Sequence, residues 1–359
     1  MTKEEIIQNF NPSAPGLSNA TIFGLPFSAE QSEIIIIPVP WEVTVSYGSG
    51  ASKGPEAVFE SSFQVDLMHE NYPELWKLGI FFDKIPSNWV KNSKKFKEIA
   101  QDIIEAQENG DDISKNKSLS KDLETINIAC RNLHDEVSAK TTDWLNKGKK
   151  VVLLGGDHST PLGYYEALSK IHHHFGILHI DAHMDFRIAY EGFTYSHASI
   201  MYNALKIEAI SQIVQVGIRD FCEEEVQVFK DNKERVSVFT NQSLQTNTFE
   251  GKNWKQQCEE IIDKLPQKVC ISFDIDGLEA WYCPNTGTPV PGGLSYDKAI
   301  YLINQLAISG KEIIGFDLVE VAPNEKDDWD GNVGARLLMT MCGAMAKSQN
   351  MEVGSVISF

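Results

Sequence analysis

The fold is decided by the stretch Ile177-Leu-His-Ile-Asp-Ala-His-Met-Asp185, which passes from a short apolar run into alternating acidic and imidazole side chains. Short apolar runs of this kind are typical of strands buried on both faces of a parallel sheet. Two other segments repeat the pattern: Val151–Leu154 precedes Gly155-Gly-Asp-His-Ser159, and Val269–Phe273 precedes Asp274-Ile-Asp-Gly277. The sequence therefore places Asp and His, residue types that bind metals, directly after several predicted buried strands.

A regular alternation of strands and helices is predicted around these segments. The predicted strands are Ile34–Ile37, Val151–Leu154, Ile177–Ile180, Ile213–Val216, Val269–Phe273 and Ile313–Leu318. The predicted helices are Thr125–Asn146, Pro161–Ile171, 253–264, 296–308 and Ala335–Lys347, with a further helix opening at Pro55. This alternation predicts an α/β fold, a three-layer α/β/α single domain with a central, mostly parallel sheet.

Composition along the chain predicts the limits of this domain. Residues 1–32 are mixed and contain Asn, Pro and Ser, and they are predicted to form an N-terminal arm. Residues 33–359 form the predicted single domain. A polar segment near residues 91–122, rich in Lys, Asp, Asn and Ser, predicts a solvated surface insert between helices.

The charge of the chain disfavours two classes of partner. Lys and Arg number 32 against 50 Asp and Glu, and the net charge of −18 argues against nucleic acid and anionic membranes. The six cysteines are scattered without a CxxC pair, as in proteins of a reducing compartment. No signal-peptide pattern is visible, and the longest apolar runs are too short to span a bilayer. The sequence predicts a soluble, cytoplasmic protein.

The acidic and imidazole residues are predicted to form one metal site. Functional groups of open α/β sheets collect beyond the carboxyl ends of the strands, and all the candidate ligands follow predicted strands. They are His158, Asp181, His183, Asp185, Asp274 and Asp276. Carboxylates packed this closely repel one another unless cations lie among them. The oxygen-rich set favours Mn²⁺, and six ligands suit two ions about 3.5 Å apart.

With these motifs the chain resembles the arginase/agmatinase (ureohydrolase) family of binuclear manganese hydrolases. The matching segments are Gly155–Ser159, Asp181–Asp185, Ser272–Leu278, Thr286–Gly293 and the early loop Gly50–Pro55. One departure follows Leu278, where Glu279-Ala-Trp-Tyr-Cys-Pro284 stands in place of the family's usual Asp-Pro. The resemblance implies an arginase-like α/β fold and two bound metal ions, with Mn²⁺ expected and Ni²⁺ as the alternative.

The resemblance also implies how the ligands are divided between the ions. One ion would take His158, Asp181, Asp185 and Asp274. The other would take Asp181, His183, Asp274 and Asp276, so that Asp181 and Asp274 bridge the two.

Three residues receive catalytic roles from the same resemblance. A hydroxide formed at the ions would attack a guanidinium carbon, and Asp185 would pass the proton to the leaving amine. His197 would be a proton shuttle at the mouth of the pocket. Glu320 would bind the guanidinium through two parallel hydrogen bonds.

The substrate is predicted from the loop Phe186–Ser196, which lacks the Asn and Ser pattern with which arginases hold an α-amino acid. Cys222 also stands where arginases place a carboxylate. These departures favour agmatine, or a similar small guanidino compound, cleaved to urea and an amine in polyamine biosynthesis. Arg187 is predicted to bind a substrate carboxylate or to pair with a nearby Asp, and Glu191 to meet a distal ammonium.

Other functions stay open at this point. The same site would suit arginase, guanidinobutyrase or guanidinase, or formimidoylglutamase activity. A catalytically silent metal-binding relative is a further alternative, which the presence of His197 and Glu320 disfavours. A single-zinc, deacetylase-like site is disfavoured because His158 and Asp276 supply ligands for a second ion. The resemblance also implies a homo-oligomer, either a trimer or a hexamer.

Overall fold

A sheet of eight strands forms the centre of the computed structural model, which describes residues 1–16 and 20–358. All neighbouring strands pair in parallel. The strands are β1 (Ile34–Val39), β2 (Ile80–Phe82), β3 (Lys150–Gly155), β4 (Phe175–Ile180), β5 (Ile210–Ile218), β6 (Val236–Thr240), β7 (Lys268–Asp274) and β8 (Glu312–Val319). Their order across the sheet is β2-β1-β3-β8-β7-β4-β5-β6.

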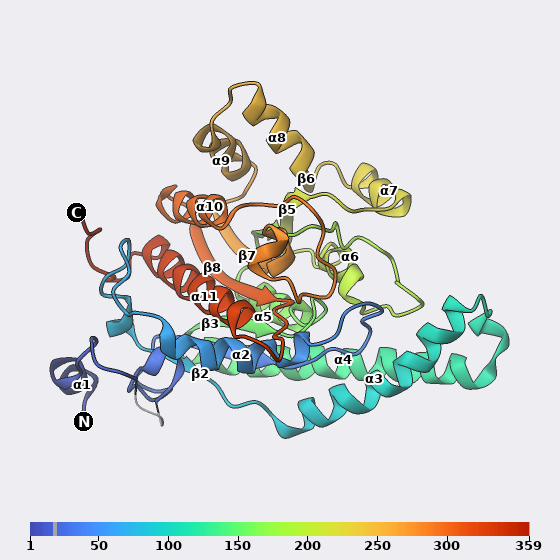
Figure 1. Ribbon diagram of the computed structural model, residues 1–359, viewed down its shortest axis with the longest axis horizontal. Coiled ribbons are helices and arrows are strands. Elements are labelled where there is room, and N and C mark those ends of the chain that lie inside the picture. The colour runs from blue at the N-terminus through green and yellow to red at the C-terminus, as the bar shows by residue number, and fades with distance from the viewer. Residues whose placement is uncertain (17–19, 359) are drawn as a thin grey trace.

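Helices cover both faces of this sheet (Figure 1). One face packs against α2 (Gly54–Ser61), α9 (Trp254–Asp263), α10 (Tyr296–Ile308) and α11 (Trp329–Ser348). The other face packs against α3 (Ser87–Glu108), α4 (Lys117–Asn146), α5 (Leu162–Ile171) and α6 (Ile200–Ala204). The remaining α-helices of the described residues are α1 (Lys3–Asn9), α7 (Glu223–Asp231) and α8 (Asn241–Phe249). The predicted three-layer α/β/α fold is confirmed.

Alternation of side chains along the strands divides the interior into two cores. Ile34 and Ile36 of β1 lie in the core that includes α11, whereas Ile37 and Val39 lie in the core that includes α4. Successive side chains of a strand point to opposite faces, so a strand buried on both faces must be apolar throughout. This requirement explains the uninterrupted Ile34–Ile37 run in the sequence.

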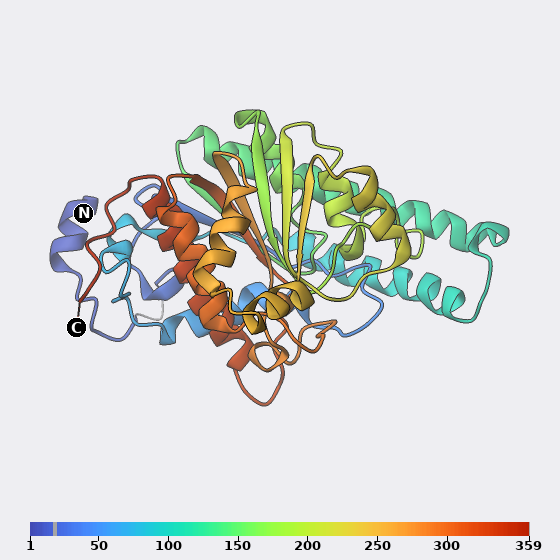
Figure 2. The ribbon, with the colours of Figure 1, turned by 90° about the horizontal axis from the view of Figure 1, so that it is seen from above.

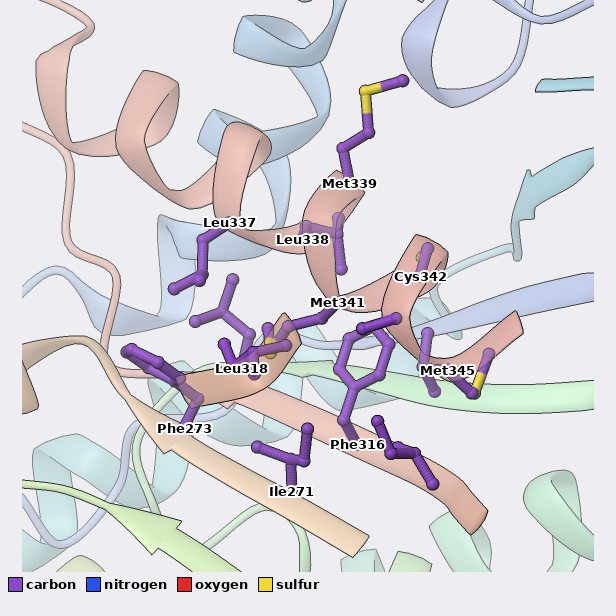
Figure 3. Close-up of a cluster of buried hydrophobic side chains, with 14 of the residues drawn as sticks. Ile271, Phe273, Phe316, Leu318, Leu337, Leu338, Met339, Met341, Cys342 and Met345 are labelled. Carbon is purple, nitrogen blue, oxygen red and sulfur yellow. The ribbon is translucent and has the colours of Figure 1, made fainter. Parts of the chain in front are cut away.

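Figure 3 shows the first core where α11 crosses the sheet. Phe273 from β7 and Phe316 and Leu318 from β8 lie against α11 side chains that include Met341 and Met345. All five side chains are fully buried. Full burial of side chains of this size contributes about 1.5–3 kcal/mol each before the cost of chain ordering is counted. The contact therefore fixes α11 to the strands that carry the predicted site.

Several elements differ from the sequence prediction. The sequence does not predict β2, which has three residues, or β6, an edge strand in which only Val236 is buried. The helices α3, α7 and α8 are also missing from the prediction, and α4 begins at Lys117 rather than at Thr125. Short or half-exposed elements carry weak apolar periodicity, which explains these omissions.

The polar segment near residues 91–122, predicted to be a solvated surface insert between helices, is itself mostly helical. It forms the end of a hairpin of α3 and α4 that projects beyond the sheet (Figure 2). Within its Lys-rich sequence, Ala100, Ile103 and Ile104 recur at helical spacing and are buried in the second core. This narrow apolar face stabilises the hairpin although its overall composition is polar.

Residues of the predicted N-terminal arm pack against the rest of the chain. Ile6, Ile22 and Phe23, all within the predicted arm 1–32, are buried in the first core. The division into an arm and a domain stays a prediction. In the described part of the chain, no helix is both long enough and apolar enough to cross a membrane.

Truncating the core beneath α11 tests this packing. We expect Phe316→Ala to lower the free energy of unfolding by about 3–5 kcal/mol, because a cavity would remain between β8 and α11. Urea denaturation followed by circular dichroism measures the loss. Phe249→Ala is the control, since Phe249 is 84% exposed and its truncation should change stability by less than about 0.5 kcal/mol. Equal losses in the two variants would contradict this description of the core.

Candidate active site

The predicted ligands converge at the carboxyl ends of the four central strands. His158 follows β3, Asp181 follows β4, Asp274 ends β7 and Glu320 follows β8. In the sheet these strands are direct neighbours, in the order β3-β8-β7-β4. The topology therefore brings together residues that lie more than one hundred positions apart in the chain, such as His158 and Asp274.

The turn after β3 depends on glycine. A Cβ atom on Gly156 would lie 2.0 Å from the carbonyl oxygen of Trp41, a distance that forbids any side chain. The tight turn leads the chain directly to His158, whose backbone N–H donates to Oε1 of Glu320 at 2.8 Å. The Gly155-Gly-Asp-His motif thus places the His158 imidazole beside the carboxylates of the next strands.

His158 forms a first group with three carboxylates. Its Nδ1 lies 3.1 Å from Oδ2 of Asp181, 3.0 Å from Oδ2 of Asp185 and 3.2 Å from Oδ2 of Asp274. All four side chains are buried, and Nδ1 has no hydrogen-bond partner among the described residues.

The other ring nitrogen of His158 fixes its tautomer. Nε2 lies 2.9 Å from Oγ of Ser272, which donates its own proton to Oδ1 of Asp317 at 2.9 Å. The Tyr165 hydroxyl donates to the second oxygen of Asp317 at 2.7 Å. Because the Ser272 proton goes to Asp317, we assign the imidazole proton to Nε2. The Nδ1 lone pair then faces three carboxylate oxygens, an arrangement that a cation between them would satisfy.

A second group contains His183, Asp181 and Asp276. Nδ1 of His183 lies 3.4 Å from Oδ1 of Asp181 and 3.1 Å from Oδ2 of Asp276. Oδ1 of Asp276 accepts the backbone N–H of Ala182 at 3.0 Å, which orients the carboxylate toward His183. Asp181 therefore offers one oxygen to each group. Asp274 belongs to the first group through its contact with His158, and its predicted bridging role stays a prediction.

The electrostatics of the two groups call for added positive charge. Burial, together with the carboxylates of Asp276 and Asp181, raises the pKa of Asp274 well above its usual range. Burial and the neighbouring Asp181 raise the pKa of Asp185 to about 6. Without a cation, both carboxyls hold their protons to a higher pH than usual, because burial and mutual repulsion disfavour the charged form. Four carboxylates and two imidazoles fit hard divalent cations such as Mn²⁺.

Backbone strain is concentrated at the same place. Asp185 and Glu320 adopt φ angles of 54° and 63°, in the left-handed region that favours glycine. Such conformations cost of order 1–3 kcal/mol and are found mainly at functional sites, where the surrounding structure imposes them. Both residues are buried and both line the cavity described next.

A cavity of about 360 Å³ opens over the two groups. Its lining includes seven of the predicted site residues: His158, His183, Asp185, Arg187, His197, Asp274 and Glu320. Asp181 and Asp276 lie within the groups but are not among the lining residues. The cluster is therefore open to a small molecule on one side and closed by the sheet on the other.

His197 and Glu320 both contribute to the cavity wall. Burial, followed by the nearby imidazoles of His183 and His158, lowers the pKa of His197 to about 4, so its ring is neutral at pH 7. Burial and the carboxylates of Asp274 and Asp157 raise the pKa of Glu320 well above its usual range. A guanidinium beside Glu320 would restore its charged form, as a bidentate ion pair does.

Arg187 and Glu191, both predicted to contact the substrate, lie in different surroundings. The Arg187 guanidinium lies on the cavity wall, 4.7 Å from the ring centroid of Tyr190, and pairs with no carboxylate of the described residues. Glu191 is not among the lining residues, and its carboxylate accepts a hydrogen bond from Oγ of Ser46 at 2.6 Å. A contact between Glu191 and substrate stays a prediction without support from this cavity.

Some residues of the site are absent from the sequence prediction. Asp220, which follows β5 and is exposed, lines the cavity together with Tyr47 and Phe221. Its place after a strand is the signal that points to this edge of the sheet. His179 lies close to His158, Asp181 and Asp185 of the first group, but inside the apolar run of β4 it resembles a core residue.

Known proteins are similar to this chain over most of its length. The model of the arginase family matches residues 32–343. An N(1)-aminopropylagmatine ureohydrolase of Thermus thermophilus is 29% identical over 301 residues, which cover 82% of this chain and 84% of the relative. The agmatinase of Neisseria meningitidis serogroup C is 27% identical, with 88% of each chain covered.

A solved structure supports the same fold. The agmatine ureohydrolase of Thermoplasma volcanium superposes with a TM-score of 0.67 at 23% identity and covers 96% of this chain and 98% of its own. Because the family model spans most of the sequence, including all the proposed metal ligands, the chain belongs to the arginase family.

Proposed function

We propose that the chain is a binuclear-metal hydrolase that cleaves the guanidinium group of agmatine, or of a similar small guanidino compound, to urea and an amine. The observation that carries this proposal is the common cavity of the two carboxylate–imidazole groups and Glu320. The two carboxylate–imidazole groups suit metal ions, and the Glu320 carboxylate suits a guanidinium. Similarity to ureohydrolases of the arginase family supports the same activity.

The proposed ligands follow the two groups. His158, Asp181, Asp185 and Asp274 would hold one ion, and Asp181, His183, Asp274 and Asp276 the other. We propose Mn²⁺ as the metal because carboxylates dominate the set, with Ni²⁺ as the alternative. When bound, two such ions supply Lewis acidity that lowers the pKa of water toward neutrality.

The remaining roles belong to the chain's own side chains. Glu320 would orient the guanidinium through parallel hydrogen bonds, so that its carbon lies over the metal ligands. Asp185 would take the proton that is released when water adds to the guanidinium carbon, and would pass it to the nitrogen of the departing amine as the C–N bond breaks. The neutral imidazole of His197 would exchange protons between this centre and solvent.

The distal end of the substrate is proposed from the cavity wall. The exposed carboxylate of Asp220 would pair with a distal ammonium, as on agmatine. The unpaired guanidinium of Arg187 favours a second candidate, a guanidino acid such as guanidinobutyrate, because a substrate carboxylate would complete its hydrogen bonds. The proposal includes a cytoplasmic homo-oligomer, a trimer or hexamer, acting in polyamine biosynthesis, since hydrolysis of agmatine yields a diamine.

Metal removal tests the activity. We expect the purified protein to release urea from agmatine, to lose this activity after dialysis against a chelator, and to regain it when Mn²⁺ is added. The assay is run on a panel of agmatine, arginine, guanidinobutyrate, guanidinopropionate and guanidine, with Ni²⁺ compared. Turnover that survives thorough chelation, or the absence of turnover across the whole panel with metal bound, would contradict the proposal.

Removing the charge of Glu320 tests the guanidinium contact. We expect Glu320→Gln to lower kcat/KM for agmatine by about 10- to 100-fold, because a hydrogen bond to a charged group is lost. Steady-state kinetics measure the effect. Glu312→Gln, at the opposite end of β8, is the matched control and should leave kcat/KM unchanged. Equal behaviour of the two variants would exclude the role of Glu320.

Two cavity variants distinguish the two substrate candidates. We expect Asp220→Asn to raise KM for agmatine by about 2- to 5-fold, the value of an exposed ion pair, and to leave KM for guanidine unchanged. Arg187→Gln should have no effect on agmatine. Preferred turnover of guanidinobutyrate by the wild type, lost in Arg187→Gln, would instead establish the guanidino acid as the substrate class.

A further inference from the structure

His179 is a fully buried histidine that no metal or catalytic role uses. It lies in β4, two residues before Asp181, and its Nε2 is 2.8 Å from Oδ2 of Asp181. Its ring nitrogen is also close enough to the ligand atoms of His158 and Asp185 to share an ion with them. Geometry alone thus allows two roles, a direct metal ligand or a group that orients the Asp181 carboxylate.

Gln215 on the neighbouring strand β5 decides between these roles. It pairs directly with His179 across the sheet, and its Nε2 lies 2.7 Å from the carbonyl oxygen of Met184 and 3.0 Å from Nδ1 of His179. A backbone carbonyl can only accept, so the amide nitrogen of Gln215 must point toward Met184. The reversed amide would bring two acceptor oxygens to within 2.7 Å of each other.

The amide orientation determines the protonation of His179. The second N–H of Gln215 donates to Nδ1, so Nδ1 carries the lone pair of the ring. The ring proton is therefore on Nε2, where it is donated to Oδ2 of Asp181. A neutral imidazole has one lone pair, and here Gln215 occupies it. His179 has no lone pair left for a metal ion.

The consequence is that both oxygens of Asp181 have a fixed donor. Oδ1 accepts the backbone N–H of His183 at 2.6 Å, and Oδ2 accepts the Nε2 proton of His179. Oδ1 then faces the second group, and Oδ2 faces Nδ1 of His158 in the first group. With one donor on each side, the carboxylate cannot rotate away from either group.

We propose that His179 and Gln215 are a positioning pair that holds Asp181 as the shared ligand of two metal ions and that His179 is not itself a ligand. The inference rests on the proposed function in that it requires two ions at the cluster. The pair acts along a line that runs from the Met184 carbonyl through Gln215 and His179 to Asp181. Oε1 of Gln215 remains without a hydrogen-bond partner among the described residues, which is consistent with an orientation imposed by Met184.

The test measures metal affinity and does not depend on turnover. Full-length protein is stripped with a chelator and titrated with Mn²⁺ in a calorimeter. We expect His179→Leu and Gln215→Leu each to weaken binding of at least one ion by about 10- to 100-fold, the usual effect of losing a group that supports a ligand. His179→Gln should stay within about 3-fold of the wild type, because an amide still offers Asp181 a donor and Gln215 an acceptor.

Gln257→Leu is the matched control. Gln257 is a glutamine on α9 that is as buried as Gln215, and its amide donates to Oγ1 of Thr248, away from the cluster. Its loss should lower the melting temperature without changing metal affinity. Circular dichroism confirms the fold of every variant, and if His179→Leu does not fold, Gln215→Leu and His179→Gln carry the same test.

Two results would overturn the inference. Wild-type affinity in Gln215→Leu would mean that the amide does not act through His179. Loss of an ion in His179→Gln as severe as in His179→Leu would mean that His179 is a direct ligand. A wild-type protein that binds fewer than two ions would refute the proposed binuclear site itself, so the failure of the positioning pair and the failure of the proposed function are distinguishable.

Discussion

Repulsion among four buried carboxylates at one edge of the sheet is the constraint on which the rest of the structure depends. Backbone N–H groups stabilise three of these carboxylates by donating hydrogen bonds to them. The N–H of His183 donates to Asp181, that of Asp276 to Asp274, and that of Ala182 to Asp276. Their remaining oxygens face imidazole nitrogens, with no Lys or Arg of the described residues paired to them. Divalent cations bound there would resolve the repulsion and, in the same place, would supply the chemistry that hydrolysis of a guanidinium requires.

The order of the strands in the sheet brings these carboxylates together at one site. Because β8 and β7 insert between β3 and β4, Glu320, the proposed guanidinium contact, lines one cavity together with four of the proposed metal ligands, His158, His183, Asp185 and Asp274. The hydrophobic contact of Phe273 and Phe316 with α11 secures these two central strands. Left-handed backbone at Asp185 and Glu320 is tolerated because the packed strands beneath it leave little freedom. Stability and function are thus connected through the same few strand ends.

Much of this arrangement is predictable from the sequence. Buried parallel strands are continuous apolar runs, and the proposed metal ligands come directly after these runs in the chain. The segment Ile177–Asp185 contains both signals. Elements with a weak apolar pattern are harder to predict. The strand β6 is a half-exposed edge strand, and α3 has a narrow apolar face within a mostly polar sequence. His179 resembles an ordinary residue of a core strand, because the role that we propose for it depends on Gln215, a partner on another strand. Asp220 requires knowledge of where β5 ends.

Anomalous diffraction from crystals grown with Mn²⁺ tests the central claim most directly, since it locates the ions without reference to any substrate. We predict two peaks per chain, about 3.5 Å apart, one beside His158 and Asp185 and the other beside His183 and Asp276, with Asp181 between them. A single peak, or a peak bonded to Nε2 of His179, would contradict this prediction.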